Sequence, residues 1–180
     1  MNKENSIDSF YKQLFGKASY LIILVIVFAV LDVYVFPSFN KKIAIWSVML
    51  GVILKIFFIV NLSFKQLIKI IEKSHLLSHI LVLFGFLIGV IIISFTMDFS
   101  ALHLIDNDTF QNKLDADSSN LRVIFEHLYF STITFSSVGY GDIVPFTIPA
   151  KIVVMLEIAL RFFVLVFGIA NINQIKVGSN

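Results

Sequence analysis

Hydrophobic residues fall in long continuous runs that short polar segments separate. Four such runs cover residues 18–36, 43–62, 81–97 and 149–171. An α-helix needs roughly 17–25 apolar residues to cross the ~30 Å hydrocarbon core of a bilayer, and each run meets that length. The runs are continuous rather than alternating, which favours helices over membrane-spanning strands. The pattern therefore predicts an all-α membrane protein with four transmembrane helices.

Two polar segments carry an apolar stripe at helical spacing, residues 1–17 and 63–78. An amphipathic helix on the inner membrane surface is one interpretation of residues 1–17, and a frayed chain terminus is the other. For residues 63–78 we favour an interfacial helix over a passive linker. Such a helix would join the 18–62 helical hairpin to the rest of the chain.

A further apolar segment, residues 122–136, is too short to cross the membrane. Its roughly 15 residues give a helix of about 22 Å, which is less than the ~30 Å core. Asn120 is a candidate N-cap, and it ends the longest polar stretch of the chain, residues 98–120. The segment must enter the membrane and return, and the irregular backbone that follows it must be enclosed by protein or water.

The residues after this re-entrant helix, 137–142, read Ser-Val-Gly-Tyr-Gly-Asp. A backbone that aims several consecutive carbonyl oxygens at one axis alternates between right- and left-handed dihedrals. Glycine adopts the left-handed half at little cost, and Gly139 and Gly141 stand at alternate positions. Rings of carbonyl oxygens of this kind replace the hydration shell of a potassium ion.

This motif resembles the selectivity filter of potassium channels, of the bacterial type with four transmembrane helices and a single pore loop. The resemblance covers about half of the chain and implies a pore domain over residues 79–173. Its parts would be an outer helix at 79–97, an extracellular loop at 98–121, a pore helix at 122–136, the filter at 137–142 and an inner helix at 149–171. One chain carries one loop, so the resemblance implies a homotetramer.

The resemblance also assigns roles within the filter. Potassium would bind at Ser137, Val138, Gly139 and Tyr140, with Gly141 at the mouth. The expected supporting residues are Tyr129, Phe130, Thr134 and Asp142. Asp142 would accept a hydrogen bond from the pore helix, where Tyr129 carries the hydroxyl. Ser137 replaces the usual threonine, and we expect potassium preference to survive this change.

Several charged residues lie within the apolar runs, where charge indicates function. Glu157 and Arg161 are four residues apart on the expected inner helix, so we expect Arg161 to point away from the central cavity and pair with Glu157. Gly168 is the candidate flexible point for a gate. In the first hairpin we expect Asp32 and Lys55 not to meet, with Lys55 extending toward the inner surface.

Other features bear on how such a channel would be gated and how cations would reach it. We expect His75 and His79 to be interfacial residues rather than a metal or pH-sensing pair, and the regular arginine repeat of a voltage sensor is absent. Acidic residues dominate the loop region, where they would attract cations to the mouth. They are Asp98, Asp106, Asp108, Asp115, Asp117 and Glu126.

Composition agrees with a membrane protein. The 180 residues are 58% hydrophobic and 14% charged, and the net charge of +2 gives no indication of a nucleic-acid partner. There is no cysteine and no catalytic constellation, so we expect neither an enzyme nor an organic cofactor. The expected partners are the lipid bilayer and further copies of the chain.

We therefore predict a passive potassium-selective channel. If the loop that carries the filter faces the outside of a cell membrane, both chain termini are cytoplasmic. We expect this membrane to be a bacterial inner membrane. The rival hypotheses are a weakly selective cation channel, a potassium transporter subunit, and a non-conducting regulatory subunit.

Overall fold

The computed structural model describes residues 22–35, 38–73, 77–111, 114 and 118–176. These residues are mostly helical, with one small sheet. The elements are an apolar helical segment, Ile22–Val35, that ends in the π-helix η1 (Leu31–Val35), then α2 (Lys41–Lys73), α3 (Leu77–Ile105), η3 (Asn107–Thr109), β1 (Phe110–Gln111), α4 (Asn120–Phe135), β2 (Val144–Pro145) and α5 (Ile148–Lys176).

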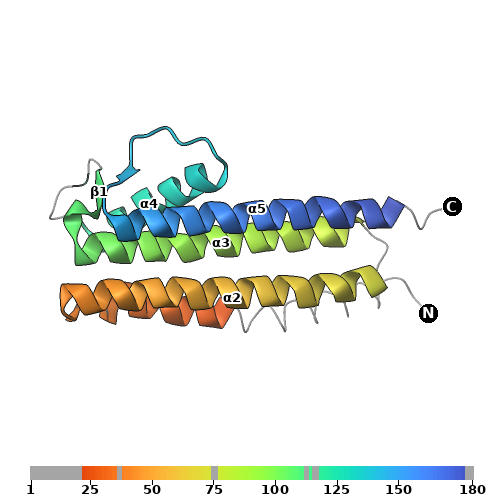
Figure 1. Cartoon of the computed structure of the whole chain (residues 1–180), viewed down its shortest axis with the longest axis horizontal. Helices are drawn as coiled ribbons and strands as arrows, with labels where there is room; N and C mark the ends of the chain where they lie inside the picture. The colour runs from red at the N-terminus through yellow and green to blue at the C-terminus, as the bar shows by residue number, and fades with distance from the viewer. Residues whose placement is uncertain (1–21, 36–37, 74–76, 112–113, 115–117, 177–180) are drawn as a thin grey trace.

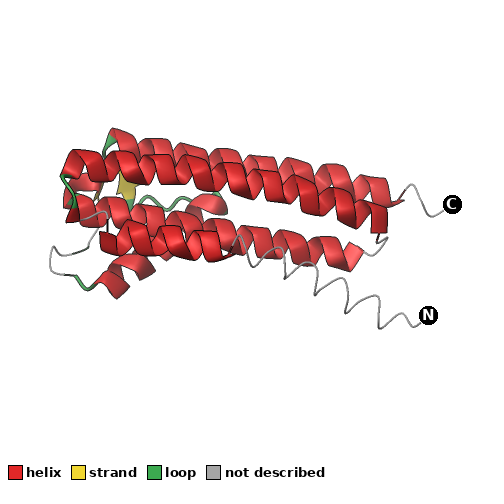
Figure 2. Ribbon diagram, turned by 90° about the horizontal axis from the view of Figure 1, so that it is seen from below, coloured by secondary structure: helices red, strands yellow, loops and turns green. Residues whose placement is uncertain are grey.

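The long helices α2, α3 and α5 lie lengthwise beside one another, and the shorter α4 packs against one half of this assembly (Figures 1 and 2). The central helix is α3, which packs against η1, α2, α4 and α5. Among the described residues, two helices are long and apolar enough to cross a membrane, Lys41–Asn61 and Phe84–Ile105. The fold is therefore consistent with an all-α membrane protein.

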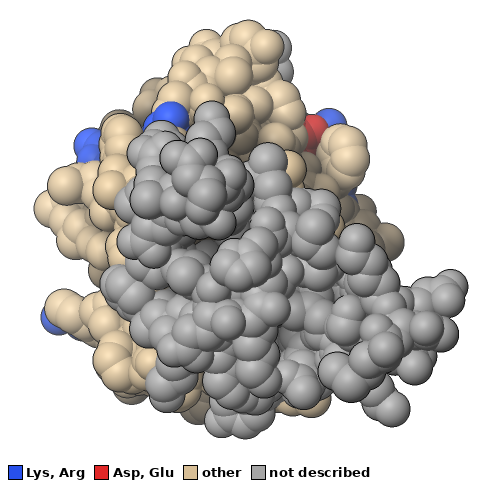
Figure 3. All heavy atoms as spheres, turned by 90° about the vertical axis from the view of Figure 1, so that its right-hand side faces the viewer, with Lys and Arg blue, Asp and Glu red and all other residues tan. Residues whose placement is uncertain are grey.

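The two sides of α2 differ. Large apolar side chains at Ile43, Trp46, Leu50, Ile53 and Phe57 are exposed at helical spacing. The opposite stripe is buried against the other helices, and Lys55 lies within it. An exposed apolar stripe on a long helix is suited to contact with lipid. Among the described atoms that the end-on view shows, only a few belong to Lys, Arg, Asp or Glu (Figure 3).

Three helices are longer than expected, and α5 (Ile148–Lys176) extends the expected inner helix of 149–171 toward its C-terminal end. The expected interfacial helix at 63–78 is largely a continuation of α2, which runs unbroken to Lys73. The expected outer helix at 79–97 continues to Ile105, because the polar residues that follow have partners inside the protein. Asp98 contacts Lys55, and the Ser100 hydroxyl donates to the Thr96 carbonyl over 2.7 Å.

The connections around α4 hold it in place. Ser119, rather than Asn120, is its N-cap and accepts from the Arg122 amide at 3.4 Å. After α3 the chain forms β1, which pairs antiparallel with β2, so that Phe110 lies opposite Pro145. This pairing joins the end of α3 to the segment that follows residues 137–142. The expected helix at 1–17 and His75 lie outside the described residues.

Candidate functional site

An aromatic cluster attaches α4 to α3. The ring centroid of Phe99 lies 5.1 Å from that of Phe130 and 5.7 Å from that of Phe110, both in edge-to-face geometry. His127 of α4 is fully buried, with its ring 5.0 Å from Phe110 and 5.4 Å from His103. Edge-to-face pairs at these distances are stabilising, so the position of α4 is fixed by packing along its buried side.

Ser131 joins three helices through one hydroxyl group. Its Oγ lies 2.5 Å from Glu157 Oε1 of α5 and 3.2 Å from the Ile92 carbonyl oxygen of α3. Ser131 and Glu157 are both fully buried. The helices α3, α4 and α5 therefore meet at a polar contact inside an apolar core.

The backbone after α4 folds back onto the end of that helix. The amides of Val138 and Gly139 donate to the Ile133 carbonyl at 2.9 and 3.3 Å, and the Ser137 amide donates to Thr134 at 3.0 Å. These bonds satisfy carbonyl groups that a helix C-terminus leaves without partners. A trans peptide points its C=O away from its N–H, and none of the described peptides is cis. The carbonyl oxygens of Ser137 and Val138 therefore point away from α4.

The dihedral angles alternate through the same residues. Positive φ occurs at Ser137 (60°), Gly139 (56°) and Gly141 (79°). The expected left-handed conformation of both glycines is confirmed. Ser137 was not expected to share it, and a β-branched threonine would be more strained there than serine. The structure thus offers a local reason for serine at this position.

This loop lies on the surface of the single chain. The Val138 and Tyr140 side chains are 51% and 72% exposed. Within the described residues, no backbone hydrogen bond occupies the carbonyl oxygens of 137–141. A row of such oxygens can ligate a dehydrated cation. One loop provides only one side of an ion site.

The supporting residues have different surroundings. Tyr129 meets Asp142 as the sequence predicts, and hydrogen bonding to this carboxylate is the main cause that raises the Tyr129 pKa to about 12. Asp142 Oδ1 also accepts from the Ile143 amide at 3.1 Å. Phe130 lies in the aromatic cluster, and Thr134 contributes its carbonyl to Ser137.

The expected ion pair between Glu157 and Arg161 is wrong. Glu157 faces Ser131 of α4, and its Oε2 has no hydrogen-bond partner. Arg161 Nη1 instead donates to the Ser137 hydroxyl, and the guanidinium lies 5.0 Å from the Phe162 ring centroid. Four residues advance a helix by slightly more than one turn, so the two side chains start from neighbouring turns, and each is directed to a different partner, Ser131 for Glu157 and Ser137 for Arg161. Gly168 lies in α5, and the structure describes no surroundings for it.

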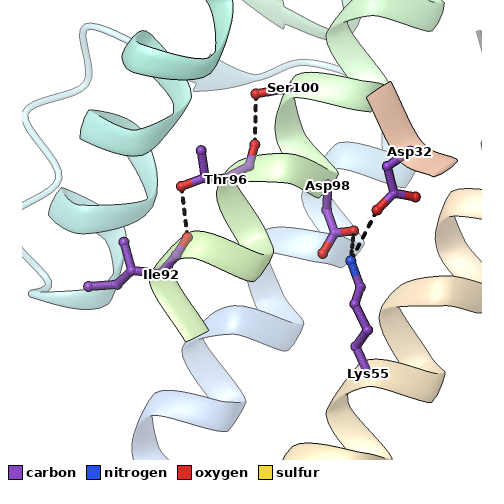
Figure 4. A network of polar contacts seen from close by, with 6 residues as sticks. All are labelled: Asp32, Lys55, Ile92, Thr96, Asp98 and Ser100. Carbon is purple, nitrogen blue, oxygen red and sulfur yellow. Dashed lines mark hydrogen bonds and ion pairs between the residues drawn. The ribbon is translucent and has the colours of Figure 1, made fainter. Parts of the chain in front are cut away.

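The expectation that Asp32 and Lys55 do not meet is also wrong. Lys55 is 2% exposed and does not reach the inner surface. Its Nζ lies 3.2 Å from Asp32 Oδ2 and contacts Asp98 Oδ1 (Figure 4). Asp98 therefore does not belong to the acidic loop, and Asp106 of that loop pairs with Lys41 at 2.8 Å. Asp115 and Asp117 lie outside the described residues.

Sequence reasoning missed the contact between His103 and His127. The two residues are 24 positions apart, and no local spacing indicates their contact. Among the described residues, no group of three or more potential ligands is arranged to hold a metal ion. The two rings are in contact, with centroids 5.4 Å apart, so the pair contributes to packing around α4.

Comparisons with known proteins address the pore half of the chain. A family model described as "Ion channel" matches residues 80–176. No curated protein and no solved structure matches the chain. The matched segment contains α4, the loop at 137–142 and α5, and it supports a pore of the potassium channel type. Because this segment exceeds half of the 180 residues, the chain belongs to the ion channel family.

Proposed function

We propose that the chain is one subunit of a homotetrameric, potassium-selective channel. Potassium would pass down its electrochemical gradient through stacked rings of backbone carbonyls from residues 137–141. The observation that carries this proposal is the positive φ at Ser137, Gly139 and Gly141 directly after a short helix. Alternating dihedrals turn consecutive carbonyls toward one side, which is the arrangement that a dehydrated potassium ion requires.

The exposed loop supports assembly. Irregular backbone at membrane depth is tolerated only where protein or a water-filled path surrounds it. A single chain leaves residues 136–142 uncovered, together with the large side chains of Val138 and Tyr140. Further copies would cover these groups and complete each ring of oxygens. The number four comes from the resemblance of the motif to potassium channel filters.

The remaining assignments follow from the same arrangement. The C-terminal end of α4 carries partial negative charge from the helix dipole, which would favour a cation near the filter. With the filter facing outward in a cell membrane of four-span subunits, both chain termini would be cytoplasmic. Potassium is the permeant ion, and the proposal requires no organic cofactor.

Flux in liposomes tests the proposal, with potassium and sodium gradients compared and barium added as a pore blocker. The matched variants are Gly139→Ala and Gly85→Ala. Neither added methyl group meets an atom within 4 Å, but only Gly139 has positive φ, at 56°. Alanine is strained there and favourable in the α3 helix. We expect Gly139→Ala to abolish barium-sensitive potassium flux and Gly85→Ala to retain it.

Equal sodium and potassium flux through the unaltered chain would contradict selectivity. Equal potassium flux in the two alanine variants would contradict the role of the loop. Native mass spectrometry of the detergent-solubilised protein tests assembly. A tetramer is expected, and a monomer or dimer would contradict the proposal.

A second candidate, a non-conducting channel subunit, is favoured by the contact of Arg161 with Ser137. A guanidinium at the innermost residue of the motif would repel potassium. This candidate predicts a tetramer that shows no flux until Arg161 is replaced by a neutral residue.

A further inference from the structure

Three charged side chains from three separate elements meet inside the protein, and we call them the buried triad. Asp32 comes from η1, Lys55 from α2 and Asp98 from α3, and they are 0%, 2% and 1% exposed. The Lys55 ammonium lies between the two carboxylates (Figure 4). The buried triad therefore joins the helices of residues 22–73 to α3 inside the protein, whereas the other ion pair between these parts, Lys41 with Asp106, is largely exposed at Lys41.

The charges of the buried triad do not balance if all three groups are ionised. Two carboxylates face one ammonium, which leaves an excess negative charge. The nearby ionisable group on α5 is Glu157, which interacts electrostatically with Asp98 and is itself acidic. Among the described residues, Lys55 is the one cation paired with Asp32 or Asp98. Arg161 is directed to Ser137 instead.

The hydrogen bonding of the buried triad is also incomplete. Lys55 Nζ contacts one oxygen of each carboxylate, while Asp32 Oδ1 and Asp98 Oδ2 are buried and have no hydrogen-bond partner. Buried polar atoms normally have partners, and an uncompensated buried charge is neutralised rather than retained. The group that removes an excess negative charge without requiring additional space is a proton.

We propose that the buried triad is a proton-binding site, in which Asp32 and Asp98 together hold one proton beside a charged Lys55. One protonated carboxyl, one carboxylate and one ammonium give zero net charge. The bound proton keeps the contact between the hairpin and α3 neutral. Its release would leave unbalanced charge between the two halves of the chain, so the site couples their packing to protonation. This inference does not depend on whether the chain conducts potassium.

Infrared spectroscopy of the purified full-length chain tests the site, because a protonated carboxylic acid has a C=O stretch that shifts in D₂O. The background variant is Glu157→Gln, which removes the other buried carboxyl near Asp98. In this background we expect one carboxylic acid band at neutral pH. Asp32→Asn and Asp98→Asn should each remove the entire band, because either change leaves one carboxylate balanced by Lys55.

Two explanations of the band can be told apart in this way. If the two carboxyls share one proton to balance charge, either substitution removes the band. If one aspartic acid is neutral merely because it is buried, only the substitution of that residue removes it. Absence of the band before substitution, or its persistence in either asparagine variant, would overturn the proposal. Lys55→Met should double the band, since both carboxyls must then be protonated. If that variant does not fold, the two asparagine variants still test the proposal. They should fold, because asparagine retains a side-chain oxygen that can accept a hydrogen bond from Lys55.

Discussion

Lys55 and Arg161 are both cations within apolar helices, but the structure treats them differently. Lys55 is buried and contacts two carboxylates that lie 23 and 43 residues away in the sequence. Arg161 has a carboxylate only four residues away, at Glu157, and does not pair with it. Its partner is the hydroxyl of Ser137, 24 residues earlier.

The difference shows that the helix face, rather than sequence distance, selects the partner. Lys55 lies on the buried stripe of α2, so its side chain meets α3 and η1. Glu157 is buried in α5, while Arg161 is half-buried and directed to Ser137. A charge surrounded by protein requires compensation, whereas a charge beside a water-filled path, where the proposed channel would place Arg161, does not. Removing Lys55 should therefore affect stability, and removing Arg161 should affect conduction.

Lys55→Met should have the largest effect, a loss of about 3–5 kcal/mol in the free energy of unfolding, because the carboxylate that Lys55 balances loses its partner and must take up a proton to stay buried. Denaturation of the detergent-solubilised protein measures it. Lys42→Met is the control, since Lys42 is an exposed lysine of the same helix. Equal losses in the two variants would show that the buried triad contributes nothing beyond a surface lysine.

Ser131→Ala should reduce stability by about 2 kcal/mol, because it leaves a buried Glu157 oxygen without its partner. The same denaturation assay applies, with Ser136→Ala as the control. The Ser136 hydroxyl is exposed and donates within its own helical turn to the Thr132 carbonyl at 2.8 Å. Wild-type stability of Ser131→Ala would mean that Glu157 is held by another residue, and would reopen its pairing with Arg161.

Arg161→Gln should increase potassium flux more than tenfold. Even from about 10 Å, a unit charge would contribute about 1.7 kcal/mol at an effective dielectric constant of about 20, and 1.4 kcal/mol is a factor of ten. Liposome flux measures the effect, and Arg161→Lys, which retains the charge, should remain close to the unaltered chain. Similar flux in both variants would indicate that the charge of Arg161 does not face the ion path.

Lys41→Ala should have the smallest effect, less than about 1 kcal/mol in stability. The Lys41 side chain is 60% exposed in its pair with Asp106, and exposed ion pairs are weak and screened by salt. Denaturation at low and high salt tests this prediction. A loss as large as that of Lys55→Met would contradict the distinction between exposed and buried lysines.

Sequence by itself determined the helical membrane class, the short helix before residues 137–142 and the left-handed glycines of that motif. These features depend on local properties, namely the length of apolar runs and the backbone freedom of Gly139 and Gly141. The contact of Tyr129 with Asp142 was also predictable, because the resemblance of the motif supplied it.

Only the tertiary structure decided which polar side chains meet. The buried triad, the contact of Ser131 with Glu157 and the contact of Arg161 with Ser137 each join different elements. The end of α3 was misplaced for the same reason, since Asp98 resembles a loop residue until Lys55 is placed beside it. Apolar periodicity shows that a helix is buried, but the rotation of each helix against its neighbours is set by packing of the whole chain.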